Sequence, residues 1–419
     1  MLLGLHSLLT FYAVYHQPLW SPRDELAHYD YIDKLSGFHL PRMGEEISDY
    51  SLRLTLDYST WKKPPSFDGT AKGMGVTGLS YEIQQPALYY LLLAGPNRML
   101  KSAGVAPLRQ IFMLRGLQFF FIVLGSLLAI PIFKELRLLF GTDPLWGYVW
   151  SFYLSLSITW TGVQLTNDNL SLLAGNAVLY ATLRFLRERT IFWNFVSAVL
   201  AVTACWVKAT NGLFLLLHLA VRAPAGMRKD GGPRMRTLAT ALPFLLLLLQ
   251  TGFNTLYHHD PFKTGMVRDH FASWVPSEGH PLRFIATLVC DSVDLKHMGL
   301  HPPLTFAVVL MVFFAAKAVW LVSAAIRARA LRFAPGFAAL IMSLAVAGFA
   351  LALNFLSPGV HWVSFRHYQG YALFWGVALW QFPFGSEAFH RRFTIPALAV
   401  LAAVAEIYYA YRLVLVYPL

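Results

Sequence analysis

The chain has 419 residues, of which 56% are hydrophobic and only 13% are charged. Soluble globular proteins carry about 25% charged residues, so this composition excludes a disordered chain, a soluble enzyme and a nucleic-acid-binding protein. The net charge of +12 comes from 34 Lys and Arg against 22 Asp and Glu, an excess that in a membrane protein belongs to cytoplasmic loops.

Many apolar runs are long enough to cross about 30 Å of hydrocarbon as helices. Since a backbone in lipid must satisfy its own hydrogen bonds, they predict an all-α polytopic membrane protein, one domain over residues 1–419 with about eleven spans. The first run lacks a cationic start and a small-residue cleavage site, so we expect a retained span and not a signal peptide. The predicted spans are 1–17, 110–133, 146–165, 170–187, 191–206, 208–221, 237–257, 303–326, 335–356, 368–384 and 394–416.

Basic residues set the orientation, because cytoplasmic loops are enriched in Lys and Arg. Alternate connections between the spans carry Lys134 and Arg137; Arg184, Arg187 and Arg189; Arg222, Arg228, Lys229, Arg234 and Arg236; Arg327, Arg329 and Arg332; and Arg391 and Arg392. We therefore expect a multi-pass protein of the plasma membrane, the bacterial inner membrane, with residues 18–109, the 166–169 turn, Lys208, the 258–302 loop and the 357–367 loop on the outer side.

The first outer loop, residues 18–109, is long enough to suggest a function of its own. Near its start, Leu26, Tyr29, Ile32 and Leu35 are spaced as on one face of a helix, which predicts an amphipathic helix on the outer membrane surface. Gln84–Leu100 reads as a short apolar helix. If it spanned the membrane, every later basic loop would change sides, so we expect a re-entrant or interfacial helix.

Asp24 and Glu25 follow the first span directly. In one interpretation Ser21 caps a helix, Pro22 takes its first position and Asp24 completes a capping-box-like pair. In the other, the acidic pair points into a cavity at the membrane face, where a carboxylate can take a proton from an acceptor nucleophile.

Two more outer segments carry acidic or amide residues. Glu82 and Gln85 precede Tyr89 and Tyr90; an interfacial aromatic belt explains the tyrosines but not the charge and the amides. Asp168 lies in a tight turn between two spans, where it either caps the next helix or faces the same cavity as Asp24. Two outer carboxylates can orient a sugar or hold a divalent cation, although oxygen ligands alone are weak grounds for a metal.

Cations occur at two further outer positions. Lys208 lies between two apolar runs, where it either serves a functional partner or extends to the outer interface. Arg366, His367 and Tyr368 stand at the outer start of a late span, where Arg366 either grips phosphate oxygens or anchors the interface.

The chain shows no strong metal or nucleotide motif. The 258–301 loop is rich in histidine, but it has no pair of histidines four apart with an intervening Glu. The two cysteines predict neither a disulfide framework nor a thiolate metal site. No glycine-rich phosphate-binding loop is present.

In their order and on their common side, these segments resemble the GT-C superfamily of integral membrane glycosyltransferases, which includes protein O-mannosyltransferases and lipid A aminoarabinose transferases. Asp24-Glu25 matches the acidic catalytic motif of the first outer loop, and Asp168 resembles the second acidic position. Glu82 through Tyr90 is similar to the Pro-Pro-Leu-Tyr-Tyr helix, with Gln85-Pro86 for the Pro-Pro pair. Lys208-Ala209-Thr210-Asn211 resembles a Lys-Pro-Thr segment with Ala for Pro, and Arg366-His367-Tyr368 resembles a Gly-Arg-Tyr motif with His inserted.

The resemblance implies transfer of a hexosyl or pentosyl group from a polyprenyl-phosphate-linked donor to a lipid, glycan or protein acceptor in the cell envelope, with inversion at the anomeric carbon. Asp24 is then the base, with Glu25 orienting or replacing it. The substrate-binding residues are Glu82, Gln85, Asp168, Lys208, Arg366, His367 and Tyr368. No cofactor is required if the two cations suffice, and a bound divalent ion is the open alternative.

Two rival functions remain open. A transporter or lipid flippase predicts inverted repeats and ionisable residues deep in several spans; no repeat is evident, and the residues of this kind are mainly Lys317, Glu406 and Arg412. A catalytically idle membrane scaffold predicts that Asp24, Asp168, Lys208 and Arg366 do not converge in space.

Overall fold

The computed structural model describes residues 2–16, 25–58, 80–140, 163–215, 217–219 and 233–259, with isolated positions between 392 and 411. Every regular element in this part of the chain is a helix, and it contains no strand. The all-α prediction is confirmed for these residues.

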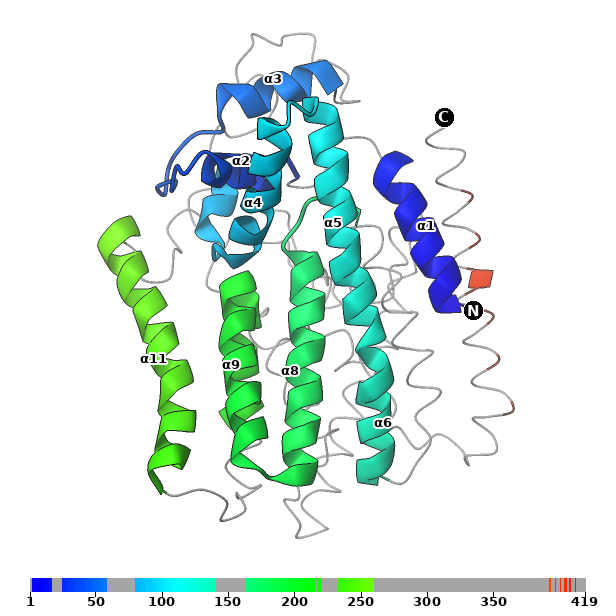
Figure 1. Cartoon of the computed structure of the whole chain (residues 1–419), viewed down its shortest axis with the longest axis vertical. Coiled ribbons are helices and arrows are strands. Elements are labelled where there is room, and N and C mark those ends of the chain that lie inside the picture. Colours follow the sequence, from blue (N-terminus) through cyan, green and yellow to red (C-terminus); the bar gives the residue numbers. More distant parts are fainter. Residues whose placement is uncertain are drawn as a thin grey trace, which may run out of the picture.

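Long helices lie side by side and form the body of the molecule (Figure 1). Their bounds are α1 Leu2–His16, α5 Pro107–Leu127, α6 Ala129–Phe140, α8 Asp168–Glu188, α9 Ile191–Val207 and α11 Pro233–His258. Helix α8 packs against α5 and α6 on one side and α9 on the other, α11 packs against α9, and α1 lies beside α5. The predicted runs 1–17, 170–187, 191–206 and 237–257 therefore coincide with observed helices.

Helices α5 and α6 continue in nearly the same direction and together replace the predicted run 110–133 (Figure 1). The segment Pro107–Leu139 is 33 residues long and is the one helix of the described residues long and apolar enough to cross a membrane. Pro107 occupies a first-turn position, where its missing N–H costs no hydrogen bond. A turn at Leu128, three residues before Pro131, separates the two helices.

A close approach joins α5 to α8. A Cβ atom on Gly125 would lie 3.3 Å from Leu172 Cγ and from two backbone atoms of Leu173, so the small residue lets the two helices meet. The Asn176 side chain donates a hydrogen bond to the Gly125 carbonyl at 2.7 Å. The register of α8 along α5 is thereby fixed.

Local signals end and start the neighbouring helices. Arg189 adopts a left-handed conformation with φ +56° at the end of α8, the position that glycine takes most easily. Thr190 then caps α9, its hydroxyl accepting a hydrogen bond from the Trp193 N–H. A tight α8–α9 hairpin results.

The described parts of the segment between α1 and α5 fold at one end of the long helices (Figure 1). They contain α2 Glu25–Ser36, α3 Asp49–Tyr58, the short 3₁₀ helix η2 Tyr81–Gln84 and α4 Leu88–Ser102. The predicted helix over Gln84–Leu100 is thus two elements, with α4 starting at Leu88. Helix α2 forms where the sequence predicted it, but His28 and Tyr31 are buried along with the apolar stripe, so α2 is a covered core helix and not a surface one.

The remaining predicted spans are described less fully or not at all. The run 208–221 begins with the 3₁₀ helix η3 Ala209–Gly212 and continues as helix at 213–215 and 217–219. The end of the run 146–165 is a turn at 163–165, and the described positions 396–411 are helical. The rest of 146–165, and the predicted spans 303–326, 335–356 and 368–384, lie outside the described residues.

Candidate functional site

A buried ion pair anchors the start of α2. The Arg115 guanidinium donates from Nε to Glu25 Oε1 at 2.7 Å and from Nη2 to Glu25 Oε2 at 2.5 Å, and both side chains are 0% exposed. Glu25 Oε1 also accepts the Leu165 backbone N–H at 3.0 Å. One carboxylate therefore ties together α2, α5 and the turn before α8.

Gln118 lies three residues after Arg115 on α5. It also binds the backbone segment that precedes α8. Its Oε1 accepts hydrogen bonds from the Tyr89 hydroxyl at 2.5 Å, the Thr166 N–H at 3.0 Å and Asn169 Nδ2 at 3.1 Å. Its Nε2 donates to the Gln164 carbonyl at 2.5 Å. This buried amide fixes the backbone immediately before Asp168.

Asp168 and Lys208 form a second buried ion pair, with Lys208 Nζ donating to Asp168 Oδ1. The two residues are only 2% and 4% exposed. Asn167, the residue at the cap position of α8, makes no side-chain cap hydrogen bond and donates instead to the Val207 carbonyl at 3.4 Å. The alternative of a simple capping turn therefore does not describe these side chains, and Lys208 points inward and not toward an exposed interface.

A third group of buried contacts joins α2, η2 and α4 through His28, Glu82 and Tyr90. The Tyr90 hydroxyl donates to Glu82 Oε2 at 3.0 Å and lies 2.9 Å from His28 Nδ1. Because the hydroxyl's one hydrogen goes to Glu82, the His28 Nδ1–H is the donor in the second contact. His28 Nδ1 is also 3.5 Å from Glu82 Oε2, and both side chains are buried.

The Tyr89 hydroxyl interacts electrostatically with three carboxylates, those of Glu25, Glu82 and Asp168. Burial, followed by the negative charges of Glu25, Asp168 and Glu82, raises the pKa of the Tyr89 hydroxyl well above its usual value. The phenol therefore stays protonated and serves as a hydrogen-bond donor. We call this group the polar cluster; its members are Glu25, His28, Glu82, Tyr89, Tyr90, Arg115, Gln118, Asp168 and Lys208.

The structure brings together four residues that the sequence singled out, namely Glu25, Glu82, Asp168 and Lys208. Gln85 follows η2, and its side-chain oxygen is buried with no hydrogen-bond partner among the described residues. Asp24, Arg366, His367 and Tyr368 lie outside the residues that the structure describes.

Sequence reasoning missed two central members of the polar cluster, Arg115 and Gln118. Both lie in the predicted run 110–133, three residues apart on one face of an otherwise apolar helix. That spacing was an available signal, because polar side chains inside an apolar helix mark functional or paired positions. Arg115 also adds to the few ionisable residues noted within predicted spans.

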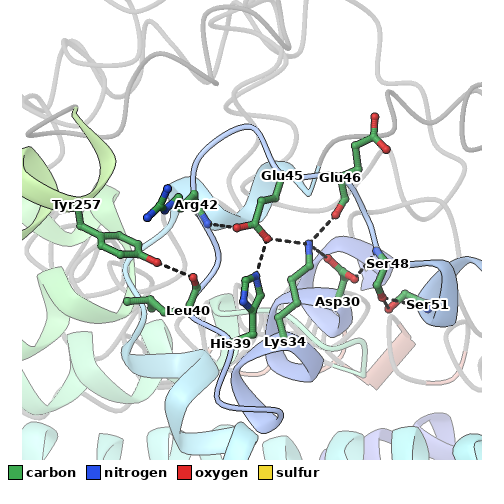
Figure 2. Close-up of polar contacts among 10 residues, drawn as sticks. All are labelled: Asp30, Lys34, His39, Leu40, Arg42, Glu45, Glu46, Ser48, Ser51 and Tyr257. Carbon is green, nitrogen blue, oxygen red and sulfur yellow. Dashed lines mark hydrogen bonds and ion pairs between the residues drawn. The ribbon is translucent and has the colours of Figure 1, made fainter.

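A separate set of polar contacts holds the loop that follows α2 (Figure 2). We call it the loop clasp; its members are Asp30, Lys34, His39, Leu40, Arg42, Glu45, Glu46, Ser48, Ser51 and Tyr257. Lys34 Nζ donates to the Glu46 carbonyl at 2.6 Å and lies 2.9 Å from Asp30 Oδ2. Asp30 Oδ1 accepts the Ser48 N–H at 2.9 Å. These contacts hold residues 37–48 against α2.

The loop clasp also reaches α11. The Tyr257 hydroxyl donates to the Leu40 carbonyl at 2.7 Å (Figure 2), and the Arg42 guanidinium lies 5.6 Å from the centre of the Tyr257 ring. The segment after α2 is thus bound to the C-terminal end of α11.

Glu45 makes the loop clasp sensitive to acid. Partial burial raises the pKa of Glu45, but hydrogen bonds from the Arg42 N–H and His39, and the charges of His39 and Lys34, lower it below its ordinary value of 4.5. A carboxyl with a lowered pKa contributes stability above its ordinary pKa and loses it as the pH falls through the lower value. In the wild type we expect amide hydrogen exchange in residues 37–48 to become faster as the pH falls below about 4.5, through the lowered pKa of Glu45. The variant Glu45→Gln should lack this pH dependence. An identical pH profile in the variant would contradict the assignment.

Among the described residues, no group of three or more His, Cys, Asp or Glu is arranged to hold a metal ion. No protein-family model matches the chain, and neither a curated protein nor a solved structure matches it.

Proposed function

We propose that the chain is a membrane glycosyltransferase of the GT-C type that moves a hexosyl or pentosyl group from a polyprenyl-phosphate donor to a lipid, glycan or protein acceptor. The observation that carries this proposal is the polar cluster. Three carboxylates and a lysine, drawn from separate segments of the sequence, lie around one tyrosine at one end of the helices. A catalytically idle scaffold predicts that Asp24, Asp168, Lys208 and Arg366 do not converge. Of these four residues the structure describes Asp168 and Lys208, and these two form an ion pair.

The membrane arrangement rests on the distribution of charge along the bundle. The polar cluster lies at the end where α8 begins and α9 finishes, whereas α6 and α8 end, and α9 begins, at the opposite end (Figure 1). Lys134, Arg137, Arg184, Arg187 and Arg189 belong to that opposite end. By the positive-inside rule the basic end is cytoplasmic and the polar cluster is extracytoplasmic, in a multi-pass protein.

In the proposed reaction Asp24, Lys208 and Arg366 each have one role. Asp24 removes the proton from the acceptor hydroxyl or amine, which attacks the anomeric carbon of the donor sugar. The bond between that carbon and the phosphate oxygen breaks, and the phosphate keeps the electron pair. Lys208 and Arg366 stabilise the developing negative charge. If these two cations suffice for charge neutralisation, no metal is needed, and a bound divalent ion is the alternative.

The observed ion pairs refine the roles of the neighbouring residues. Glu25 has both oxygens engaged by Arg115, which favours its role in orienting Asp24 over its role as a substitute base. Asp168 holds Lys208 and so sets where the ammonium meets the donor phosphate. Glu82 and Gln85 remain the candidates for hydrogen bonds to sugar hydroxyls.

Lys208 provides the experiment that tests this proposal. A hydrogen bond to a charged group contributes about 1.5–3 kcal/mol, so Lys208→Met is expected to raise the KM for a polyprenyl-phosphate sugar about 10- to 100-fold. Because the change leaves Asp168 buried without its cation, the double variant Lys208→Met/Asp168→Asn is the matched control: it should recover folded yield but not donor use. Unchanged donor dependence in both variants would remove Lys208 from the phosphate site.

A further inference from the structure

Helices α6 and α8 end at the end of the bundle opposite the polar cluster (Figure 1). Cations lie in the C-terminal parts of these two helices and in the turn that follows α8. We call this group the basic rim; its members are Lys134, Arg137, Arg184, Arg187 and Arg189. Two carboxylates, Glu135 and Glu188, lie among them. Five cations and two carboxylates leave the group with a net charge of +3.

The two carboxylates hold a pair of guanidinium groups in place. Glu135, which is buried, lies 3.4 Å from Arg184 Nη1 and 2.8 Å from Arg187 Nε. Glu188 pairs with Arg184 and lies 3.0 Å from Arg187 Nη2. Arg184 and Arg187 are therefore fixed side by side before any ligand arrives, which lowers the entropic cost of binding an anion.

Two other cations of the basic rim make no ion pair within the part of the chain that the structure describes. They are Lys134 and Arg137, which are exposed on α6. The uncompensated charge of the rim therefore faces outward.

Exposed apolar side chains follow two of the rim's cations closely in sequence, Leu138 after Arg137 and Phe192 after Arg189. Leu138 is 55% exposed and Phe192 is 60% exposed, and the apolar segment Pro107–Leu139 ends here. Trp193 donates its indole N–H to Glu188 at 2.7 Å while Arg184 lies 4.7 Å from its ring centre. A tryptophan with one apolar and one hydrogen-bonded edge is typical of a membrane interface.

We propose that the basic rim binds the phosphate headgroups of anionic phospholipids, with their acyl chains against Leu138 and Phe192. A soluble anion would use the cations but would leave the exposed apolar side chains without a partner. An anionic lipid matches both, because basic groups at the end of a span bind phosphate headgroups. This site is separate from the polar cluster and does not depend on the proposed transferase reaction.

Native mass spectrometry of the purified full chain tests the proposal, with phosphatidylglycerol and phosphatidylcholine as probes. We expect wild-type protein to retain phosphatidylglycerol preferentially. The double variant Lys134→Gln/Arg137→Gln leaves the Glu135 pairs intact, so it should fold. It is expected to lose about fivefold in affinity for each cation removed, the equivalent of about 1 kcal/mol per charge near an anionic surface.

The matched control removes two exposed cations at the other end, Arg53→Gln/Arg98→Gln, and should retain phosphatidylglycerol as the wild type does. Equal retention of the two lipids by the wild type, or an equal loss in the two double variants, would overturn the proposal. So would inorganic phosphate alone displacing bound phosphatidylglycerol at equal concentration, because the site would then take free phosphate.

Discussion

Replacing Arg115 with leucine is expected to destabilise the protein by about 3–5 kcal/mol, the usual cost of leaving one partner of a buried ion pair uncompensated. Glu25 would keep its negative charge in a site from which water is excluded. It would also lose the two hydrogen bonds that place its carboxylate under the Leu165 N–H. We expect a lower midpoint of chemical denaturation in detergent and a smaller yield of monodisperse protein.

The double variant Arg115→Leu/Glu25→Leu separates the cost of the orphaned charge from the cost of losing the side chain. Replacing both partners of a buried pair with apolar residues is often neutral for stability, so the double variant should recover most of the lost stability. The proposed transferase activity should stay low, because Glu25 no longer orients Asp24. If the single and double variants are equally unstable, Arg115 does not stabilise the protein through its ion pair with Glu25.

Asp24→Asn is expected to lower sugar transfer by about 100-fold to 10,000-fold, the range that general-base catalysis supplies. Asparagine keeps the shape of the side chain but cannot accept a proton from the acceptor at neutral pH. The folded yield should be unchanged, since the substitution adds no buried charge. The measurement is the initial rate of glycosylated acceptor formed at saturating donor.

Asp49→Asn is the matched control for this prediction, because Asp49 is an exposed aspartate in the first turn of α3, in the same segment between α1 and α5. We expect wild-type rates from it. Transfer at the wild-type rate by Asp24→Asn would exclude Asp24 as the base and leave the carboxylates of the polar cluster to be tested in turn.

The helices of the bundle could be predicted because each apolar run carries its own signal. The bounds of α8 and α9 lie within two residues of the predicted runs, and their ends follow from local features such as Thr190 and Arg189. Local sequence is sufficient where the burial of apolar side chains decides whether a segment becomes a helix.

The pairings within the polar cluster could not be predicted in the same way. Glu25 and Arg115 are 90 positions apart and Asp168 and Lys208 are 40 apart, and nothing in spacing along the chain selects one cation for one carboxylate. The apolar stripe of α2 by itself predicts a helix on the membrane surface. Its other faces are covered by contacts with α4, including the stacking of Tyr31 on Tyr90 at 4.1 Å, which depend on tertiary structure.

The most direct test of the proposed function is the amount of free polyprenyl phosphate that purified protein releases from a panel of polyprenyl-phosphate-linked hexoses and pentoses. We predict release from at least one donor, in a one-to-one ratio with glycosylated acceptor and at least about 100-fold slower in Asp24→Asn. Folded wild-type protein that releases no polyprenyl phosphate from any donor, or releases it equally with asparagine at position 24, would contradict the assignment of this cluster to glycosyl transfer.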